Sequence, residues 1–373
     1  MPGSYNETMA LDVCIRGAGI VGRTLALLLS QARLRVALVR PQGAAASADA
    51  NSDVRAYALN TASKELLERV RAWPDEAHAT AVCRMEVRGD AGGKLFFRAE
   101  DQGVAALAWI VDVGALLARL EDALRFQPQV QWVDAPQPAA LTVVTEGRAS
   151  STRDELHVPF HVTPYPQHAI AARLECEKPH DCVARQWFSS GEILALLPLG
   201  GRNAALVWSV ADSRAPQLLS MDAAQFAAAV EAACGGALGK MTLVSERASW
   251  PLQLARAQRW CGPGWVLAGD AAHNVHPLAG QGLNLGLADA GELAGVLQGR
   301  EYWRGVGDAR LLRRYERSRK ADVFAMGTVT DGLQQLFARG GSPWSELRNW
   351  GMSSVDHSGP VKDWLARQAM GRA

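Results

Sequence analysis

The chain has 373 residues, of which 48% are hydrophobic and 21% charged, a balance typical of a folded globular protein and not of a disordered one. Its 39 basic and 38 acidic residues leave a formal net charge of +1, which argues against a nucleic-acid partner because no broad positive field is available. The length predicts two domains, or one domain with a large insertion.

The cysteines and the apolar runs indicate a cellular compartment. Six cysteines are scattered without a CxxC pair, which fits a reducing environment. No apolar run approaches the roughly 18 residues of a membrane span, and the first residues lack the positive segment of a secretory signal. We therefore expect a cytoplasmic protein. Peripheral contact with the inner face of the membrane stays open.

The first predicted unit is a strand at 11–15, a helix at 23–31 and a strand at 36–39. Gly17, Gly19 and Gly22 form a GxGxxG motif between the first strand and the helix. Such glycines permit a tight turn and let backbone N–H groups reach a pyrophosphate at the helix N-terminus. The motif in this context predicts a dinucleotide site, the alternative being a merely structural turn.

Arg40 stands at the end of the second strand, where a dinucleotide site usually has an acid that binds the ribose hydroxyls. An arginine at this position can favour a 2′-phosphate, which makes NADP a rival ligand. A surface residue beside a weakened ribose site is the other interpretation.

The following elements are predicted from apolar periodicity. We expect helices at 60–73 and 111–124, a proline-spaced loop at 127–141 and an antiparallel sheet at 156–210. A further helix at 222–234, a strand–crossover–helix unit from 265 and a long helix at 308–337 follow. Trp187, Phe188, Leu196 and Trp208 in the sheet are either an apolar wall of a substrate site or core residues.

The segment "LAGDAAHNVHPLAGQGLNLGLADAGELAGVL" at 267–297 contains a carboxylate at a strand end and a glycine-rich helix start. Asp270 can accept hydrogen bonds from a polyol chain, and the helix beginning near Gly280 offers free N–H groups and a dipole that stabilise negative charge. A flavin has both features, a ribityl polyol and a ring that becomes anionic on reduction. The alternative is a glycine-tolerant loop that caps a core helix.

His273 and His276 lie three residues apart, but no further cluster with ligand spacing accompanies them, so we expect no metal site. The sequence also lacks a nucleophile-elbow pattern, which argues against a hydrolase.

Over nearly its whole length the chain resembles the ubiquinone-biosynthesis flavin hydroxylases, a branch of the flavoprotein aromatic monooxygenases related to p-hydroxybenzoate hydroxylase. The resemblance lies in "GAGIVG", "DVRAYAL", "EGRASSTR", "LALLPL", "GDAAHNVHPLAGQGLNLGLADAGEL", "YERSRKAD", "TDGLQQLF" and "VKDWLARQAMG". It implies an α/β fold in which a Rossmann-like FAD-binding domain carries an inserted antiparallel sheet and a C-terminal helical region. The predicted boundaries are 9–155 with 245–330, 156–244, and 331–373.

The resemblance also implies the cofactor residues. Arg55 would bind the FAD pyrophosphate and Asp270 the ribityl chain, while the isoalloxazine would be surrounded by Pro277, Gly280, Gln281, Gly282, Leu283 and Asn284. Only one GxGxxG is present, so NAD(P)H is expected to bind transiently as electron donor. Three departures from the family pattern are Arg40, Glu146-Gly147 in place of Asp-Gly, and a short segment at 127–145.

The activity implied by the resemblance is hydroxylation of an aromatic ring, a polyprenylated phenol of ubiquinone biosynthesis, through a flavin C4a-hydroperoxide and without a side-chain nucleophile. A hydroxylase of a soluble aromatic compound and a non-catalytic, flavin-poor scaffold in a quinone-synthesis complex remain open. In the tail, Val361, Trp364 and Leu365 beside Lys362 and Arg367 predict either an interfacial helix or one docked on the protein.

Overall fold

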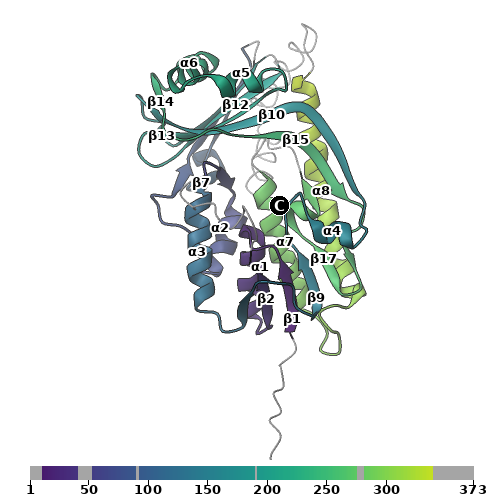
Figure 1. Cartoon of the computed structure of the whole chain (residues 1–373). Helices are drawn as coiled ribbons and strands as arrows, with labels where there is room; N and C mark the ends of the chain where they lie inside the picture. The colour runs from purple at the N-terminus through teal and green to yellow at the C-terminus, as the bar shows by residue number, and fades with distance from the viewer. Residues whose placement is uncertain (1–10, 41–52, 90–91, 190, 275–280, 339–373) are drawn as a thin grey trace, which may run out of the picture.

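The computed structural model describes residues 11–40, 53–89, 92–189, 191–274 and 281–338, the side chains of the last range only as far as Phe324. A parallel sheet with helices against it forms the lower half of the molecule, and an antiparallel sheet forms the upper half (Figure 1). The predicted α/β architecture is confirmed.

The parallel sheet begins with the predicted βαβ unit, β1 (Leu11–Arg16), α1 (Ile20–Gln31) and β2 (Val36–Val39). The strand order is β16-β17-β9-β1-β2-β8, with β16 at Cys261–Gly262, β17 at Trp265–Leu267, β9 at Ala139–Val144 and β8 at Val130–Val133. All neighbouring strands are parallel except β16 and β17, which are antiparallel. The carboxyl ends of β1, β9 and β17 therefore meet at one edge, which is where ligands bind in such sheets.

The turn after β1 depends on two glycines. Gly17 has φ +114°, and a Cβ there would overlap the backbone of Thr145 at the end of β9. A Cβ at Gly22 would overlap the carbonyl of Gly17. Both residues are therefore required for the close approach of α1 to the sheet, whatever the ligand.

Helices that pack on the parallel sheet and on one another complete the main core. Helix α1 packs between α3 (Val113–Arg125) and α7 (Gln281–Gln298), and α8 (Ala309–Ala338) packs on α7. The side chain of Tyr315 on α8 is fully buried and donates its hydroxyl to Leu267 O at 3.1 Å, which holds α8 against β17.

A second, smaller sheet is antiparallel and has the strand order β3-β7-β4. Its strands are β3 (Ala56–Leu59), β7 (Ala108–Asp112) and β4 (Ala79–Val82), and α2 (Thr61–Arg69) follows β3. Asn60 caps α2 by accepting a hydrogen bond from the Ser63 N–H at 2.9 Å.

The large sheet has the order β18-β15-β10-β13-β12-β11-β5-β6, with β14 beside β10. Its strands, in chain order, are β5 (Arg84–Arg88), β6 (Lys94–Arg98), β10 (Phe160–Cys176), β11 (Val183–Ser189), β12 (Glu192–Pro198), β13 (Asn203–Ala211), β14 (Met241–Leu243), β15 (Ala248–Ala257) and β18 (His273–Asn274). The expected sheet at 156–210 is confirmed. The sheet also takes strands from 84–98 and 248–257, outside the predicted insertion of 156–244, and the domain boundaries stay a prediction.

Helices α5 (Ala215–Ser220) and α6 (Ala223–Ala233) cover the upper face of the large sheet (Figure 1). Trp187, Leu196 and Trp208 belong to the core cluster under these helices, and Trp208 meets Phe226 of α6 with ring centroids 6.5 Å apart. The side chains of alternate strand residues point to opposite faces. These three residues are therefore core residues and not the wall of a site on the lower face.

One predicted loop contains a strand. The proline-spaced stretch at 127–141 includes β8, which pairs with β2 from Val36↔Val130 to Val39↔Val133. The pairing satisfies the free edge of β2, an interaction with a distant strand that local composition does not report.

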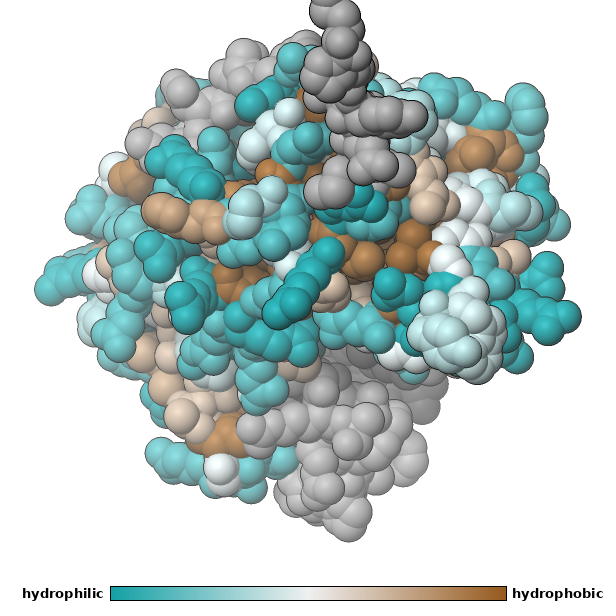
Figure 2. Space-filling view, turned by 90° about the horizontal axis from the view of Figure 1, so that it is seen from below, coloured by the Kyte–Doolittle hydropathy of each residue, from teal (hydrophilic) through white to brown (hydrophobic). Residues whose placement is uncertain are grey.

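The lower face of the molecule is mostly hydrophilic, and its apolar residues form small separate groups (Figure 2). Among the described residues, no helix has the length and apolar character needed to cross a membrane.

Candidate functional site

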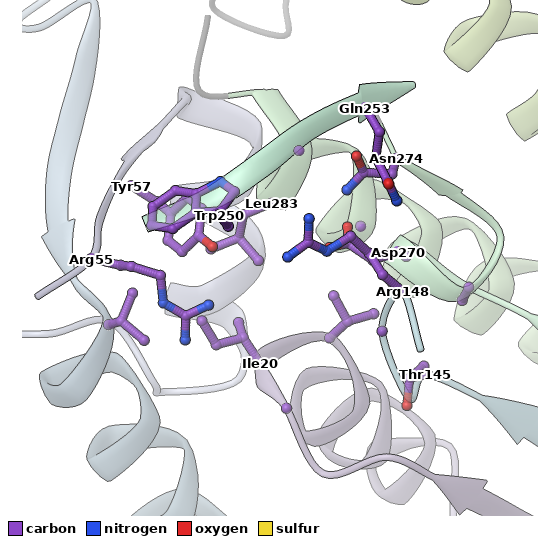
Figure 3. A pocket seen from close by; sticks show the side chains of 18 of the residues that line it. Ile20, Arg55, Tyr57, Thr145, Arg148, Trp250, Gln253, Asp270, Asn274 and Leu283 are labelled. Carbon is purple, nitrogen blue, oxygen red and sulfur yellow. The ribbon is translucent and has the colours of Figure 1, made fainter. Parts of the chain in front are cut away.

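A cavity of about 490 Å³ lies where the carboxyl edge of the parallel sheet meets the lower side of the large sheet (Figure 3). The turn after β1, strand β3, the turn after β9, strand β15, the turn after β17 and the start of α7 all contribute to it. The lining includes Gly19, Ile20, Arg55, Tyr57, Thr145, Gly147, Arg148, Trp250, Leu252, Gln253, Asp270, Asn274, Gly282 and Leu283. Segments far apart in the sequence thus form one site.

Two glycines leave open space at the cavity wall. Gly19 has an ordinary extended backbone with φ −75°, and a Cβ at Gly19 or at Gly282 would meet no protein atom within 4 Å. Packing within the protein therefore does not require glycine at either position. A ligand that approaches the backbone N–H groups of α1 and α7 closely does require it.

Asp270 lies at the cavity wall in the turn η4 (Gly269–Ala271) after β17. Burial raises the pKa of this carboxyl above its ordinary value, although His273 and Arg148 act in the opposite direction. Figure 3 shows Arg148 and Asp270 extending toward the same part of the cavity. A carboxylate there can accept hydrogen bonds from a polyol, and Arg148 adds a cation near it.

A buried network of hydrogen bonds and ion pairs around Asp289 holds the turn that carries Asp270. Asp289 of α7 is fully buried and contacts His273 Nε2 at 2.6 Å and Arg319 Nε at 2.8 Å. Its carboxylate also accepts the Gly269 N–H at 2.8 Å. Burial alone would raise the pKa of Asp289, but His273 and Arg319 lower it below its ordinary value. The network therefore fixes the backbone that carries Asp270.

Arg55 enters the cavity from the start of β3, and its guanidinium is paired with Asp53 through Nη2–Oδ2 at 2.6 Å. The Arg55 side chain therefore forms a salt bridge and also lines the cavity. Tyr57 follows two residues later, and burial raises the pKa of its hydroxyl. The cavity wall here combines a cation with an aromatic ring.

Glu146, in place of the family's aspartate, is engaged within its own turn. Its carboxylate accepts hydrogen bonds from the Ser150 hydroxyl at 2.8 Å and from the N–H and hydroxyl of Thr152 at 3.0 and 2.6 Å. Burial opposes them, but these bonds and the charge of Arg16 lower the pKa of Glu146. The longer acid therefore stabilises the start of α4 (Ser151–Glu155) and leaves Gly147 and Arg148 to line the cavity.

Arg40 lies outside the cavity lining. Its Nε is 3.3 Å from Asp134 Oδ1, and its guanidinium lies 5.3 Å from the ring centroid of Trp132 on β8. Arg23 of α1 lies 5.4 Å from the same ring centroid. The end of β2 therefore presents an arginine, a neighbouring carboxylate and an aromatic ring.

The predicted residues divide into three groups. Gly19, Arg55, Asp270, Gly282 and Leu283 line the cavity, whereas Gly17, Gly22, Arg40, Gln281 and Asn284 do not, and Pro277, Gly280 and His276 lie outside the described residues. The Asn284 side chain accepts the Asn60 N–H at 3.0 Å and the Ser63 hydroxyl at 2.7 Å, which joins α7 to α2. Its role toward a flavin stays a prediction.

Several lining residues had no predicted role. Arg148 follows directly on Glu146-Gly147, so the motif itself was a signal for it. Tyr57 lies two residues after Arg55 in a recognised motif, but Trp250 and Gln253 on β15 had no such signal.

His273 is part of the buried network, and its ring stacks on Trp260 with centroids 4.8 Å apart. Within the part of the chain that the structure describes, no group of three or more His, Cys, Asp or Glu side chains is placed to hold a metal ion.

Comparisons with known proteins agree with this geometry. Residues 137–328 match the family model of the FAD binding domain. The chain is 32% identical to ubiquinone hydroxylase UbiL of Rhodospirillum rubrum, covering 99% of this chain and 92% of the relative. It is 30% identical to the 3-demethoxyubiquinol 3-hydroxylase of Escherichia coli, covering 96% and 98%. The fold of p-nitrophenol 4-monooxygenase from Pseudomonas putida matches with a TM-score of 0.76 at 16% identity, over 98% of this chain and 99% of that one.

The cavity fits the cofactor of this family. Gly19 and Gly282 leave open space at the starts of α1 and α7, where free N–H groups suit a pyrophosphate or an electron-rich ring, and Asp270, in the lining of the same cavity, suits a polyol. From the family match over more than half of the chain, the two relatives and this donor set, we conclude that the chain belongs to the FAD-dependent monooxygenases, flavoprotein hydroxylases that take FAD as cofactor and NAD(P)H as electron donor.

Proposed function

We propose that the protein hydroxylates the ring of a polyprenylated phenol in ubiquinone biosynthesis. The observation that carries this proposal is that two relatives with ubiquinone or a ubiquinol in their names match at 30% identity or more along almost the whole chain. The structure adds a cavity with aromatic and aliphatic side chains, Tyr57, Trp250 and Leu252, on the side of the antiparallel sheets.

The residues of the chain would divide the work of holding the cofactor. Asp270 would accept hydrogen bonds from the ribityl hydroxyls, and Arg55 would pair with the pyrophosphate. The N–H groups and dipole at the start of α7 would stabilise negative charge on the ring. FAD supplies the oxygen-transfer chemistry when bound, so the protein's task is positioning, charge stabilisation and exclusion of water.

Turnover of matched phenols tests the proposal. The FAD-loaded protein is given NADH or NADPH and isotopically labelled O₂, with either a polyprenylated phenol in detergent micelles or the same phenol bearing a methyl group in place of the chain. We expect labelled oxygen in the prenylated product. Labelled product from the methyl compound alone would support a soluble substrate instead. Failure with both, despite bound FAD, would favour a scaffold in a quinone-synthesis complex.

Arg40→Glu should tighten FAD binding by roughly tenfold, since an acid at the end of β2 can accept the ribose hydrogen bonds and one such bond amounts to about 1.4 kcal/mol. Loss of the exposed contact with Asp134 should matter little. Flavin fluorescence titration measures the affinity for FAD, with FMN as control because it lacks the adenosine. An equal change for both flavins, or no change for FAD, would contradict this role for position 40. Stronger binding of NADP⁺ than of FAD by the unmodified chain would favour the rival ligand.

Contact with a membrane and with a quinone-biosynthesis complex remains part of the proposal, as does a cytoplasmic location. The tail that motivated membrane contact, including Trp364 and Leu365, lies outside the described residues.

A further inference from the structure

Cys83 and Cys182 are neighbours at the junction of the two antiparallel sheets. Cys83 lies between β4 and β5, and Cys182 directly precedes β11. The Cys83 N–H donates to Cys182 O at 2.9 Å, and the next pair in the parallel ladder is Arg84↔Val183. The two cysteines therefore lie side by side immediately before the paired strands β5 and β11, Cys182 with a left-handed backbone of φ +57°, although about 100 residues separate them in the sequence.

Their spacing suits a covalent link. Adjacent strands lie about 4.7 to 4.9 Å apart, which falls within the roughly 4.4 to 6.8 Å between Cα atoms that disulfides span. Burial raises the pKa of the Cys83 thiol, and interaction with the Cys182 thiol raises it further. Both residues are free and only partly buried.

The other four cysteines differ in accessibility. Cys14, Cys176, Cys234 and Cys261 are all buried. Burial raises the pKa of each of these thiols, to about 11 for Cys176 and about 12 for Cys261, and it raises the pKa of Cys83 as well, so the two groups differ in exposure to solvent. A dissolved oxidant therefore reaches Cys83 and Cys182 before the rest.

We propose that Cys83 and Cys182 are a redox modification site that closes to a disulfide on oxidation by hydrogen peroxide. One thiolate attacks a peroxide oxygen and the O–O bond breaks. Hydroxide is the leaving group, and the cysteine becomes a sulfenic acid. The second thiolate attacks that sulfur, the S–S bond forms and the S–O bond breaks. The two hydroxides take up the two thiol protons, so two thiols and one peroxide give one disulfide and two waters, and a dithiol reductant reverses the link.

The link would tie the start of β5 to the start of its neighbour β11 in the large sheet, directly after the end of β4 in the small sheet. Strand β4 lies in the sheet that carries Tyr57, and both β5 and β11 lie in the sheet whose β15 carries Trp250, so the link would be formed where the chain passes from one sheet to the other. Closing a loop of about 100 residues also restricts the unfolded chain, so the oxidised protein should unfold at a higher temperature.

Thiol counting on the full-length, FAD-loaded protein tests the site. After treatment with hydrogen peroxide and removal of the excess, titration in denaturant should fall from the six thiols of the chain to four. Peptide mapping without reductant should show the Cys83 and Cys182 peptides joined, with a loss of two hydrogen atoms, and dithiothreitol should restore six thiols. The thermal midpoint should rise on oxidation.

Cys83→Ser and Cys182→Ser should each abolish the cross-linked peptide and the rise in midpoint, while the matched variant Cys234→Ser should keep both. Six remaining thiols, sulfinic acid at either residue without a cross-link, or a disulfide between other cysteines would overturn the proposal. These readouts do not depend on the substrate, so their failure is separate from failure of the proposed function.

Discussion

Replacing Gly19 with alanine should weaken FAD binding by about tenfold to a hundredfold and leave folding of the apoprotein unchanged. The backbone at Gly19 is extended with φ −75°, and an added Cβ meets no protein atom within 4 Å, so the fold tolerates alanine. The methyl group would instead occupy the space through which a pyrophosphate approaches α1. Overpacking of this kind costs about 1 to 3 kcal/mol. Flavin fluorescence titration measures the affinity, and thermal unfolding of the apoprotein measures the stability.

Two other glycines are the controls. Gly22→Ala should destabilise the apoprotein, because its Cβ would overlap the Gly17 carbonyl. Gly295→Ala, at an open position on α7 away from the cavity, should leave FAD affinity at the wild-type level. If Gly19→Ala binds FAD as tightly as the unmodified chain, the cofactor does not approach this turn, and the placement of its pyrophosphate is wrong.

The parts of the fold that the sequence predicted well depend on local signals. The buried runs at 11–15 and 36–39 and the GxGxxG between them define β1, α1 and β2, because each strand, the turn and the helix are encoded within a few consecutive residues. Asp270 reached the cavity for the same reason: a carboxylate directly after a buried strand lies at the carboxyl edge of a parallel sheet.

The parts that the sequence did not predict depend on distant partners. Strand β8 lies in a proline-spaced segment and is identified by its pairing with β2. Trp250 and Gln253 reach the cavity because β15 pairs with β10 and β18, which no local pattern reports. Asn284 fits the family motif, yet its side chain binds Asn60 and Ser63 more than 200 positions earlier in the sequence.

Asp289→Asn should destabilise the protein by about 3 to 5 kcal/mol, because removing one partner of a buried ion pair leaves the other uncompensated. Asp289 is 0% exposed and Arg319 is 5% exposed, so the Arg319 cation would remain buried. The Gly269 N–H would also lose its charged acceptor, and the turn that carries Asp270 would loosen. Urea unfolding measures the loss of stability, and the FAD titration should show weaker binding in the folded fraction.

Asp322→Asn is the matched control, since Asp322 binds the same Arg319 at 2.6 Å but its side chain is 62% exposed. It should cost at most about 1 kcal/mol. The pKa of Asp289 is lowered in the folded state, so its contribution is present above the ordinary carboxyl pKa of 3.8 and is lost as pH falls through the lowered value. The difference between wild type and Asp289→Asn should therefore shrink in acid. Equal losses from the two substitutions at neutral pH would mean that burial of the Arg319–Asp289 pair does not determine the stability of this turn.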